Sequence, residues 1–103
     1  MKIQILNSAV KDLEEGRVFY EKQGGGLGNY FFDTLFSDID SLTLFGGIHR
    51  KMYGYNRLLS SRFPYAIYYK IQDEKIITVW RVLDCRKDPK KIENALWKPG
   101  RLG

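Results

Sequence analysis

Two adjacent β-prone runs, at residues 65–71 and 76–83, flank a polar turn at residues 72–75. Runs of Tyr, Ile and Val on either side of a short polar stretch predict a β-hairpin. Side chains alternate between the two faces of a strand, so the first run places Tyr65, Ile67, Tyr69 and Ile71 on one face. In the second run, Ile76, Thr78, Trp80 and Val82 should oppose Ile77, Val79, Arg81 and Leu83. Because both faces carry apolar bulk, we predict the central strand pair of a sheet.

The residues before this hairpin predict a strand and two helices. Residues 1–6 alternate Ile with polar residues, and Asn7 or Ser8 offers an N-cap to a helix that ends at the glycines 24–26. A second helix should begin at residue 27 or 28 and run to about 44. Apolar positions at helical spacing give each helix one packing face: Ala9, Leu13, Gly16 and Tyr20 in the first, and Phe31, Leu35, Ile39 and Leu42 in the second. Asp12, Glu14 and Glu15 should lie near the positive end of the first helix.

The rest of the chain predicts a small sheet and a closing helix. Residues 45–55 are glycine-rich and should form an irregular linker, followed by strands at 56–62, 63–71 and 75–84. Asp88 and Pro89 then favour an N-cap and first position of a short helix that ends near Leu96. The element order β-α-α-β-β-β-(α) indicates an α+β fold in which a helical hairpin packs on a mostly antiparallel sheet. With 103 residues, we expect a single domain over 1–103.

Composition excludes several classes of protein. A hydrophobic share of 44% with 15% aromatic residues argues against a disordered chain. The single Cys85 excludes an internal disulfide, and no Cys/His spacing suggests zinc, so we expect no metal and no cofactor. No apolar run is long enough for a membrane helix, and the first residues do not resemble a signal peptide. We therefore expect a cytoplasmic protein without membrane contact.

The charges divide the chain into two unequal halves. Residues 1–47 hold four Lys or Arg against seven Asp or Glu, a net charge of −3, whereas residues 48–103 hold thirteen against five, a net charge of +8. A basic half of this kind favours an acidic partner, either nucleic acid or an acidic protein segment, although solvated surfaces are also often basic.

Three features that suggest chemistry have simpler interpretations. The cluster at residues 24–28 follows a helix and lacks the G-x-G-x-x-G or G-K-[ST] pattern, so it favours an interhelical turn over a phosphate loop. His49 has no carboxylate or nucleophile beside it in sequence, and Cys85 has cationic neighbours but no base, which favours an inert, half-buried thiol. The aromatic residues of the strands are better explained as packing groups than as platforms for bases.

Several of these patterns together resemble the RelE/ParE superfamily, the toxins of bacterial type II toxin–antitoxin modules. The motif S-A-x-x-D-L at residues 8–13, the run FPYxIYY at 63–69 and R-x-D-P at 86–89 carry the resemblance, which covers nearly the whole chain. RelE-type members are implied to be ribosome-dependent, metal-independent mRNA endonucleases, for which Arg86, Arg62 and Arg57 would be the catalytic candidates. Fixed guanidinium groups suit that reaction because they stabilise charge on the scissile phosphate.

The departures from the RelE pattern favour the ParE-like, plasmid-stabilisation branch. Ala66 stands where a RelE-type nuclease would carry arginine, and the closing helix offers Ile92 and Trp97 in place of a tyrosine. ParE-type members are implied to bind a protein target, DNA gyrase, without chemistry of their own. The resemblance also leaves open a degenerate, non-toxic relative.

The resemblance implies a cognate antitoxin as partner, in a hetero-oligomer with an antitoxin dimer. Its acidic C-terminal segment should wrap the toxin and order on it. We predict Arg62, Arg81, Arg86 and Lys87 as the residues that bind the target or the antitoxin, and the groove between helical hairpin and sheet as the docking surface.

Overall fold

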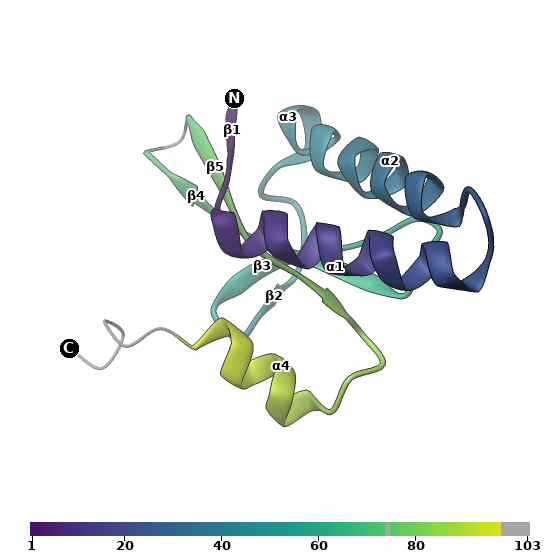
Figure 1. The fold of residues 1–103 in the computed structure, drawn as a ribbon. Coiled ribbons are helices and arrows are strands. Elements are labelled where there is room, and N and C mark those ends of the chain that lie inside the picture. Colours follow the sequence, from purple (N-terminus) through teal and green to yellow (C-terminus); the bar gives the residue numbers. More distant parts are fainter. Residues whose placement is uncertain (74, 98–103) are drawn as a thin grey trace.

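A computed structural model describes residues 1–73 and 75–97, and the predicted α+β fold is confirmed (Figure 1). The five strands lie in the order β1-β5-β4-β3-β2, with β1 parallel to β5 and the other pairs antiparallel. The elements are β1 (Lys2–Ile5), α1 (Asn7–Gln23), α2 (Leu27–Asp40), α3 (Leu42–Phe45), β2 (Lys51–Met52), β3 (Tyr55–Leu59), β4 (Tyr65–Gln72), β5 (Ile76–Asp84) and α4 (Pro89–Leu96). Glu74, in the predicted turn between β4 and β5, lies outside the described residues.

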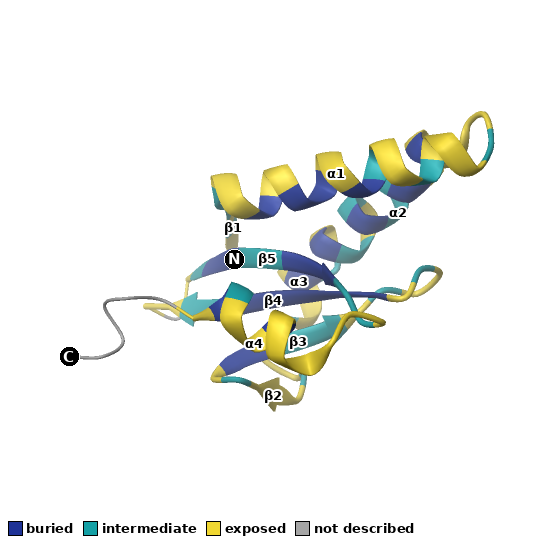
Figure 2. Ribbon diagram, turned by 60° about the horizontal axis from the view of Figure 1, so that its bottom comes forward, coloured by how far each residue is buried: buried dark blue, intermediate teal, exposed yellow. Residues whose placement is uncertain are grey.

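Helices cover both faces of the sheet (Figure 2). The hairpin of α1 and α2 lies on one face. There the predicted packing faces of the two helices contact the side of β4 that carries Tyr65, Ile67 and Tyr69. On the other face, α4 packs Ile92 and Leu96 against a second cluster that contains Tyr55, Tyr68 and Leu83. Within the described residues, no helix is both long and apolar enough to cross a membrane.

A β-bulge in β5 overturns the predicted alternation of that strand. Tyr68 of β4 lies opposite Arg81, but the next residue, Tyr69, lies opposite Val79, so that Trp80 is an extra residue in β5. A bulge of this kind shifts the following residues by one position. Val82 therefore joins Val79 in the core under the helices, and the prediction that it shares a face with Trp80 is wrong.

The strand boundaries differ from the prediction on both sides of β3. Part of the expected linker forms β2, which pairs with β3 through a tight turn in which Tyr53 and Gly54 have φ of 57° and 82°. Positive φ at both central residues is typical of a type I′ hairpin turn. At the other end, β3 stops at Leu59 and β4 starts only at Tyr65, so Arg62 lies in a loop and not at a strand end.

The start of α1 closes an open edge of the sheet. Neither Asn7 nor Ser8 caps the helix as predicted, because Leu6 occupies the N-cap position. The first turn holds no acidic residue, so the prediction that Asp12, Glu14 and Glu15 lie near the positive end of this helix is wrong. Instead, the hydroxyl of Ser8 donates to the carbonyl oxygen of Trp80 at 2.7 Å, and the carboxylate of Asp12 accepts from the backbone N–H of Val82 at 2.9 Å. These two side chains therefore hydrogen-bond to backbone groups at the edge of β5, beyond the point where β1 ends.

Two other helix predictions are confirmed. Asp88 caps α4, because its side chain accepts a hydrogen bond from the N–H of Lys90 at 3.0 Å. In the hairpin, Gly16 lets α2 approach closely: a Cβ at this position would lie 2.5 Å from ring atoms of Phe31. The α1–α2 contact therefore depends on the absence of a side chain there.

Candidate functional site

Three of the five predicted site residues lie at one end of the sheet. The loop at residues 60–64, which carries Arg62, meets the segment that carries Arg86 and Lys87, because the N–H of Cys85 donates to the carbonyl oxygen of Pro64 at 2.8 Å. The β3–β4 and β5–α4 connections thus place these cations on adjacent loops, where side chains are free to contact a partner.

Arg86 forms an exposed two-pronged ion pair with Asp84. Its Nε lies 2.9 Å from Oδ1 and its Nη2 lies 2.8 Å from Oδ2, and 58% of the arginine side chain is exposed. The hydrogen bond to Asp84 raises the pKa of Arg86, and the guanidinium lowers the pKa of Asp84. Both groups are therefore charged at neutral pH, and the exposed side of the guanidinium can meet a second anion.

Arg62 lies beside a cluster of aromatic rings. Its Nη1 donates to the hydroxyl of Tyr30 at 3.1 Å, and Tyr30 packs on Phe63 with ring centroids 5.4 Å apart. Phe63 in turn contacts Tyr20, 4.9 Å away between centroids. Arg86 interacts electrostatically with Tyr20 from the other side. Aromatic surface thus lies between the two arginines.

A cleft of about 250 Å³ opens between α1 and the end of β5. The lining residues come from α1, from the ends of β4 and β5, and from the segment after β5: Asp12, Glu15, Gly16, Phe19, Tyr65, Val82, Leu83, Asp84 and Lys87. Phe19 is 46% exposed at this cleft. Burial raises the pKa of Tyr65 to about 12, so its hydroxyl stays protonated at neutral pH. The cleft lies in the predicted groove between helical hairpin and sheet.

Arg57 lies on the opposite face of the sheet. It stands across from Tyr68 in the β3–β4 ladder, on the side covered by α4, and its Nη2 lies 3.7 Å from the sulfur of the half-buried Cys85. Arg57 thus hydrogen-bonds on the α4 side, whereas Arg62 and Arg86 bond to Tyr30 and Asp84 near the helical hairpin. The three predicted catalytic arginines thus make their hydrogen bonds to three different partners.

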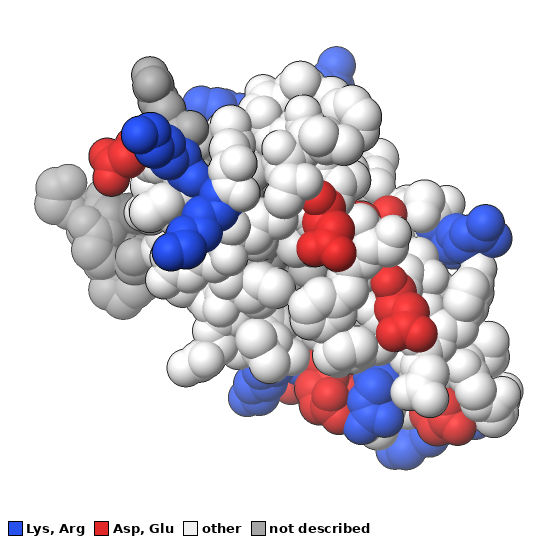
Figure 3. Space-filling view, turned by 90° about the horizontal axis from the view of Figure 1, so that it is seen from above, with Lys and Arg blue, Asp and Glu red and all other residues white. Residues whose placement is uncertain are grey.

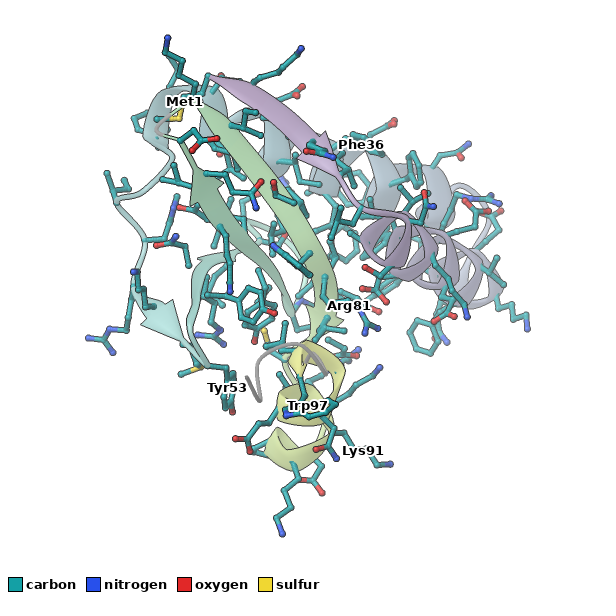
Figure 4. The ribbon with its side chains drawn as sticks, turned by 90° about the vertical axis from the view of Figure 1, so that its left-hand side faces the viewer. Met1, Phe36, Tyr53, Arg81, Lys91 and Trp97 are labelled. Carbon is teal, nitrogen blue, oxygen red and sulfur yellow. The ribbon has the colours of Figure 1, made fainter. Side chains whose placement is uncertain are left out.

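Arg81 has an internal role that the sequence analysis missed. Its Nε and Nη2 donate to the two carboxylate oxygens of Asp12 at 2.7 and 2.8 Å, and its Nη1 donates to the carbonyl oxygen of Ala95 at 3.1 Å. Figure 4 shows Arg81 at the end of β5, between α1 and α4. The spacing of Ser8 and Asp12, which places both on one helix face, was the available signal. Arg81 therefore ties α1 and α4 to β5.

His49 belongs to the loop before β2, where its imidazole contacts Tyr69. Its Nδ1 lies 2.5 Å from the hydroxyl of Tyr69, which also accepts from the N–H of Gly47 at 2.9 Å. Burial lowers the pKa of His49. In residues 1–73 and 75–97, no group of three or more His, Cys, Asp or Glu side chains is arranged to hold a metal ion.

The helical face differs in charge from the sheet end. Figure 3 looks down on this face and shows Lys and Arg around its margin, with uncharged and acidic side chains at its centre. Asp33 and Asp40 of α2 are exposed. This distribution agrees with the negative net charge of the first half of the sequence, and it directs an acidic partner away from the outer surface of the helices.

Comparisons with known proteins agree with this fold. The family described as the ParE toxin of the type II toxin–antitoxin system, parDE, matches residues 3–89. A solved structure titled "Chromosomal ParDE TA system from P. aeruginosa" superposes with a TM-score of 0.71 at 18% sequence identity, covering 80% of this chain and 92% of that one. A search of curated proteins found no match. Because the family match spans most of the sequence, this chain belongs to the ParE toxin family of type II toxin–antitoxin systems.

Proposed function

We propose that this chain arrests growth by binding a protein target, with DNA gyrase as the expected target, in the cytoplasm. The observation that carries the proposal is the surface formed by Phe19, Tyr30, Arg62, Arg86 and Lys87, which we call the end surface. Aromatic and arginine side chains are enriched among the residues that dominate protein–protein binding energy. Here Phe19 and Lys87 line the cleft, and Tyr30, Arg62 and Arg86 are further exposed residues of the end surface.

The position of the arginines supports binding over RNA cleavage. Cleavage would need several cations around one phosphate, held at fixed distances. Arg57 instead lies on the α4 side of the sheet, where it hydrogen-bonds to Cys85. Ala66, which replaces the arginine implied for RelE-type nucleases, is fully buried on the α4 side of the sheet.

We further propose that a cognate antitoxin inhibits the toxin by filling the cleft and covering the end surface. Two of the carboxylates in the cleft, Asp12 and Asp84, are neutralised by their own arginines. The ammonium group of Lys87 makes no ion pair or hydrogen bond with any described residue. An apolar antitoxin side chain could contact Phe19 in the cleft, while acidic neighbours would face Lys87 and Arg86.

The mechanism is tested by inducing the protein from a tightly repressed promoter and mapping messenger-RNA 5′ ends as growth slows. In parallel, the purified protein is added to a DNA gyrase supercoiling assay. We expect growth arrest with unchanged RNA ends and loss of supercoiling. New RNA ends in phase with codons would contradict the proposal and favour ribosome-dependent cleavage.

The surface is tested with the double variant Arg62→Ala, Lys87→Ala. Both side chains are exposed, so the melting temperature should not change, whereas the concentration needed to inhibit the target should rise about tenfold, as expected for loss of two interface charges. Arg50→Ala, an exposed cation next to β2, is the matched control and should keep full inhibition. Equal inhibition by the double variant and the control would refute the assignment of the end surface.

The antitoxin proposal has a separate test. In a structure of the complex, we expect the antitoxin segment to lie in the cleft between α1 and β5. A segment bound to the acidic outer face of the helices, with the cleft empty, would contradict this proposal and leave the toxin mechanism untouched.

A further inference from the structure

A second hollow lies beside the β2–β3 hairpin, whose turn residue Tyr53 is labelled in Figure 4. Its volume is about 380 Å³, and its lining residues are Gly47, Lys51, Gly54, Asn56, Lys70 and Ile71. It lies at the start of β3 and the end of β4, whereas the end surface lies at their opposite ends. Among the described residues, the lining includes lysine but no carboxylate, so this part of the hollow favours an anion.

Asn56 is the unusual residue of this hollow. It is only 8% exposed, yet its side-chain amide makes no hydrogen bond to any residue that the structure describes. Buried amide groups almost always have a hydrogen-bond partner, because burial without one costs stability. The amide of Asn56 lines the hollow and is not among the side-chain atoms cut off from solvent, so water or a bound molecule in the hollow supplies its partner.

The strand register places a cation next to this amide. Lys51 of β2 lies directly opposite Asn56 of β3, which lies directly opposite Tyr69 of β4, so the three side chains point to the same face. Neighbouring strands are about 4.8 Å apart, a distance that the flexible Lys51 side chain can span to reach above the Asn56 amide. The Tyr69 hydroxyl holds the wall of the hollow in place through Gly47 and His49.

Lys70 acts from the other side of the sheet. Its ammonium nitrogen lies 4.5 Å from the ring centroid of Tyr55, on the α4 face, so its charge lies there although Lys70 is also among the lining residues of the hollow. Arg50, next to Lys51, is also exposed and adds to the local positive charge.

We propose that this hollow binds a phosphate group, either as free phosphate or as part of a small phosphorylated molecule such as a nucleoside monophosphate. The Asn56 amide donates one hydrogen bond to a phosphate oxygen, and the Lys51 ammonium donates a second, charge-assisted one. The volume is well above that of one water molecule, which occupies roughly 30 Å³ in the liquid. The site is independent of the end surface.

The test follows the side-chain amide resonances of Asn56 by NMR while inorganic phosphate is added to the purified chain at constant ionic strength. We expect a saturable shift with millimolar affinity. The titration is repeated with adenosine monophosphate, where tighter binding would identify a phosphorylated molecule as the ligand and equal binding would indicate free phosphate. No saturable shift with either ligand, or acetate binding as tightly as phosphate, would overturn the proposal.

Two variants and a control test whether phosphate binding is specific to this hollow. Lys51→Ala should weaken phosphate binding about tenfold, because it removes a charge-assisted hydrogen bond, and Asn56→Leu should abolish binding. Lys91→Ala removes an exposed lysine from α4 and should change affinity less than twofold. Because Lys51 is exposed, its variant tests the proposal even where Asn56→Leu does not fold. Equal weakening by Lys51→Ala and Lys91→Ala would show non-specific attraction and refute the site.

Discussion

Replacing Asp12 by alanine should destabilise the protein more than any other removal of an ion pair described above. The Asp12 carboxylate is 6% exposed and bonds to two nitrogens of Arg81 and to the backbone N–H of Val82. Its loss leaves a guanidinium without its counter-charge and an edge N–H without an acceptor. Each of these groups was desolvated when the chain folded, so neither recovers its full hydration in the variant.

The magnitude follows from the burial of the two partners. Removing one partner of a buried ion pair costs about 3–5 kcal/mol. Arg81 is 28% exposed and can still reach water, which places the expected loss at the lower end, about 3 kcal/mol. For a domain of this size, that corresponds to a fall in melting temperature of about 12 °C or more.

The loss of stability is measured by urea denaturation, with tryptophan fluorescence as the signal and Trp80, next to Arg81, as a reporter. Asp12→Asn keeps one acceptor oxygen and should lose about half as much, which provides a folded variant if Asp12→Ala does not fold. Glu14→Gln removes a surface ion pair to Arg17 within the same helix and serves as the control, with no measurable change expected.

A double-mutant cycle separates the ion pair from the edge hydrogen bond. Arg81→Met keeps the apolar stem and removes the charge, so the coupling energy between the two sites isolates the carboxylate–guanidinium term. We expect a coupling of about 1.5 kcal/mol or more, since the residues are in direct contact. A coupling within error of zero, or Asp12→Ala as stable as Glu14→Gln, would refute the reasoning.

Three further predictions concern packing and pH. Gly16→Ala should destabilise the α1–α2 contact by about 1–3 kcal/mol through its clash with Phe31, while Gly25→Ala, with no atom within 4 Å of its Cβ, should leave the melting temperature nearly unchanged. Because burial raises the folded pKa of Tyr65 to about 12, the unfolded chain ionises first. The contribution of Tyr65 to the free energy of unfolding should therefore be fully present below the ordinary pKa of 10.0 and be lost as pH rises toward 12. Urea denaturation should show a less steep fall of stability with pH in Tyr65→Phe. Burial lowers the folded pKa of His49, so the contribution of His49 to stability should be present above pH 6.5 and lost as pH falls. His49→Gln should remove this pH dependence of the melting temperature.

Periodicity predicted the elements that bury one face. The stripes of α1 and α2 and the alternation of β4 are all found as expected, because a regular backbone keeps side chains at fixed spacing. The bulge at Trp80 was not predictable in this way. An inserted residue leaves no mark in composition, and both possible faces for Val82 are apolar. Periodicity therefore fails where a strand is buried on both sides.

The short β2 was missed for a different reason. Tyr53 adopts φ of 57° in its turn, a conformation that the sequence rules assign to Gly, Asn or Asp. Tyr53 also packs against the core beneath α4, so tertiary contact outweighs local preference. Similarly, only the fold reveals that Asn56 lines a hollow, because its amide looks like any polar strand residue in the sequence.

The two aspartate–arginine pairs show why the site residues needed the structure. Asp12–Arg81 and Asp84–Arg86 have the same two-pronged chemistry, yet the arginine side chains are 28% and 58% exposed. Arg81 also donates to the carbonyl oxygen of Ala95, so a partner that recruited its guanidinium would break the side-chain hydrogen bonds from Arg81 to both α1 and α4. Among the described residues, the guanidinium of Arg86 hydrogen-bonds only to Asp84 at the end of β5. An exposed pair contributes little to stability, so Arg86 can exchange Asp84 for a carboxylate of a partner at low cost. Identical side-chain chemistry therefore makes one arginine a structural anchor and leaves the other available for the protein contact that we propose.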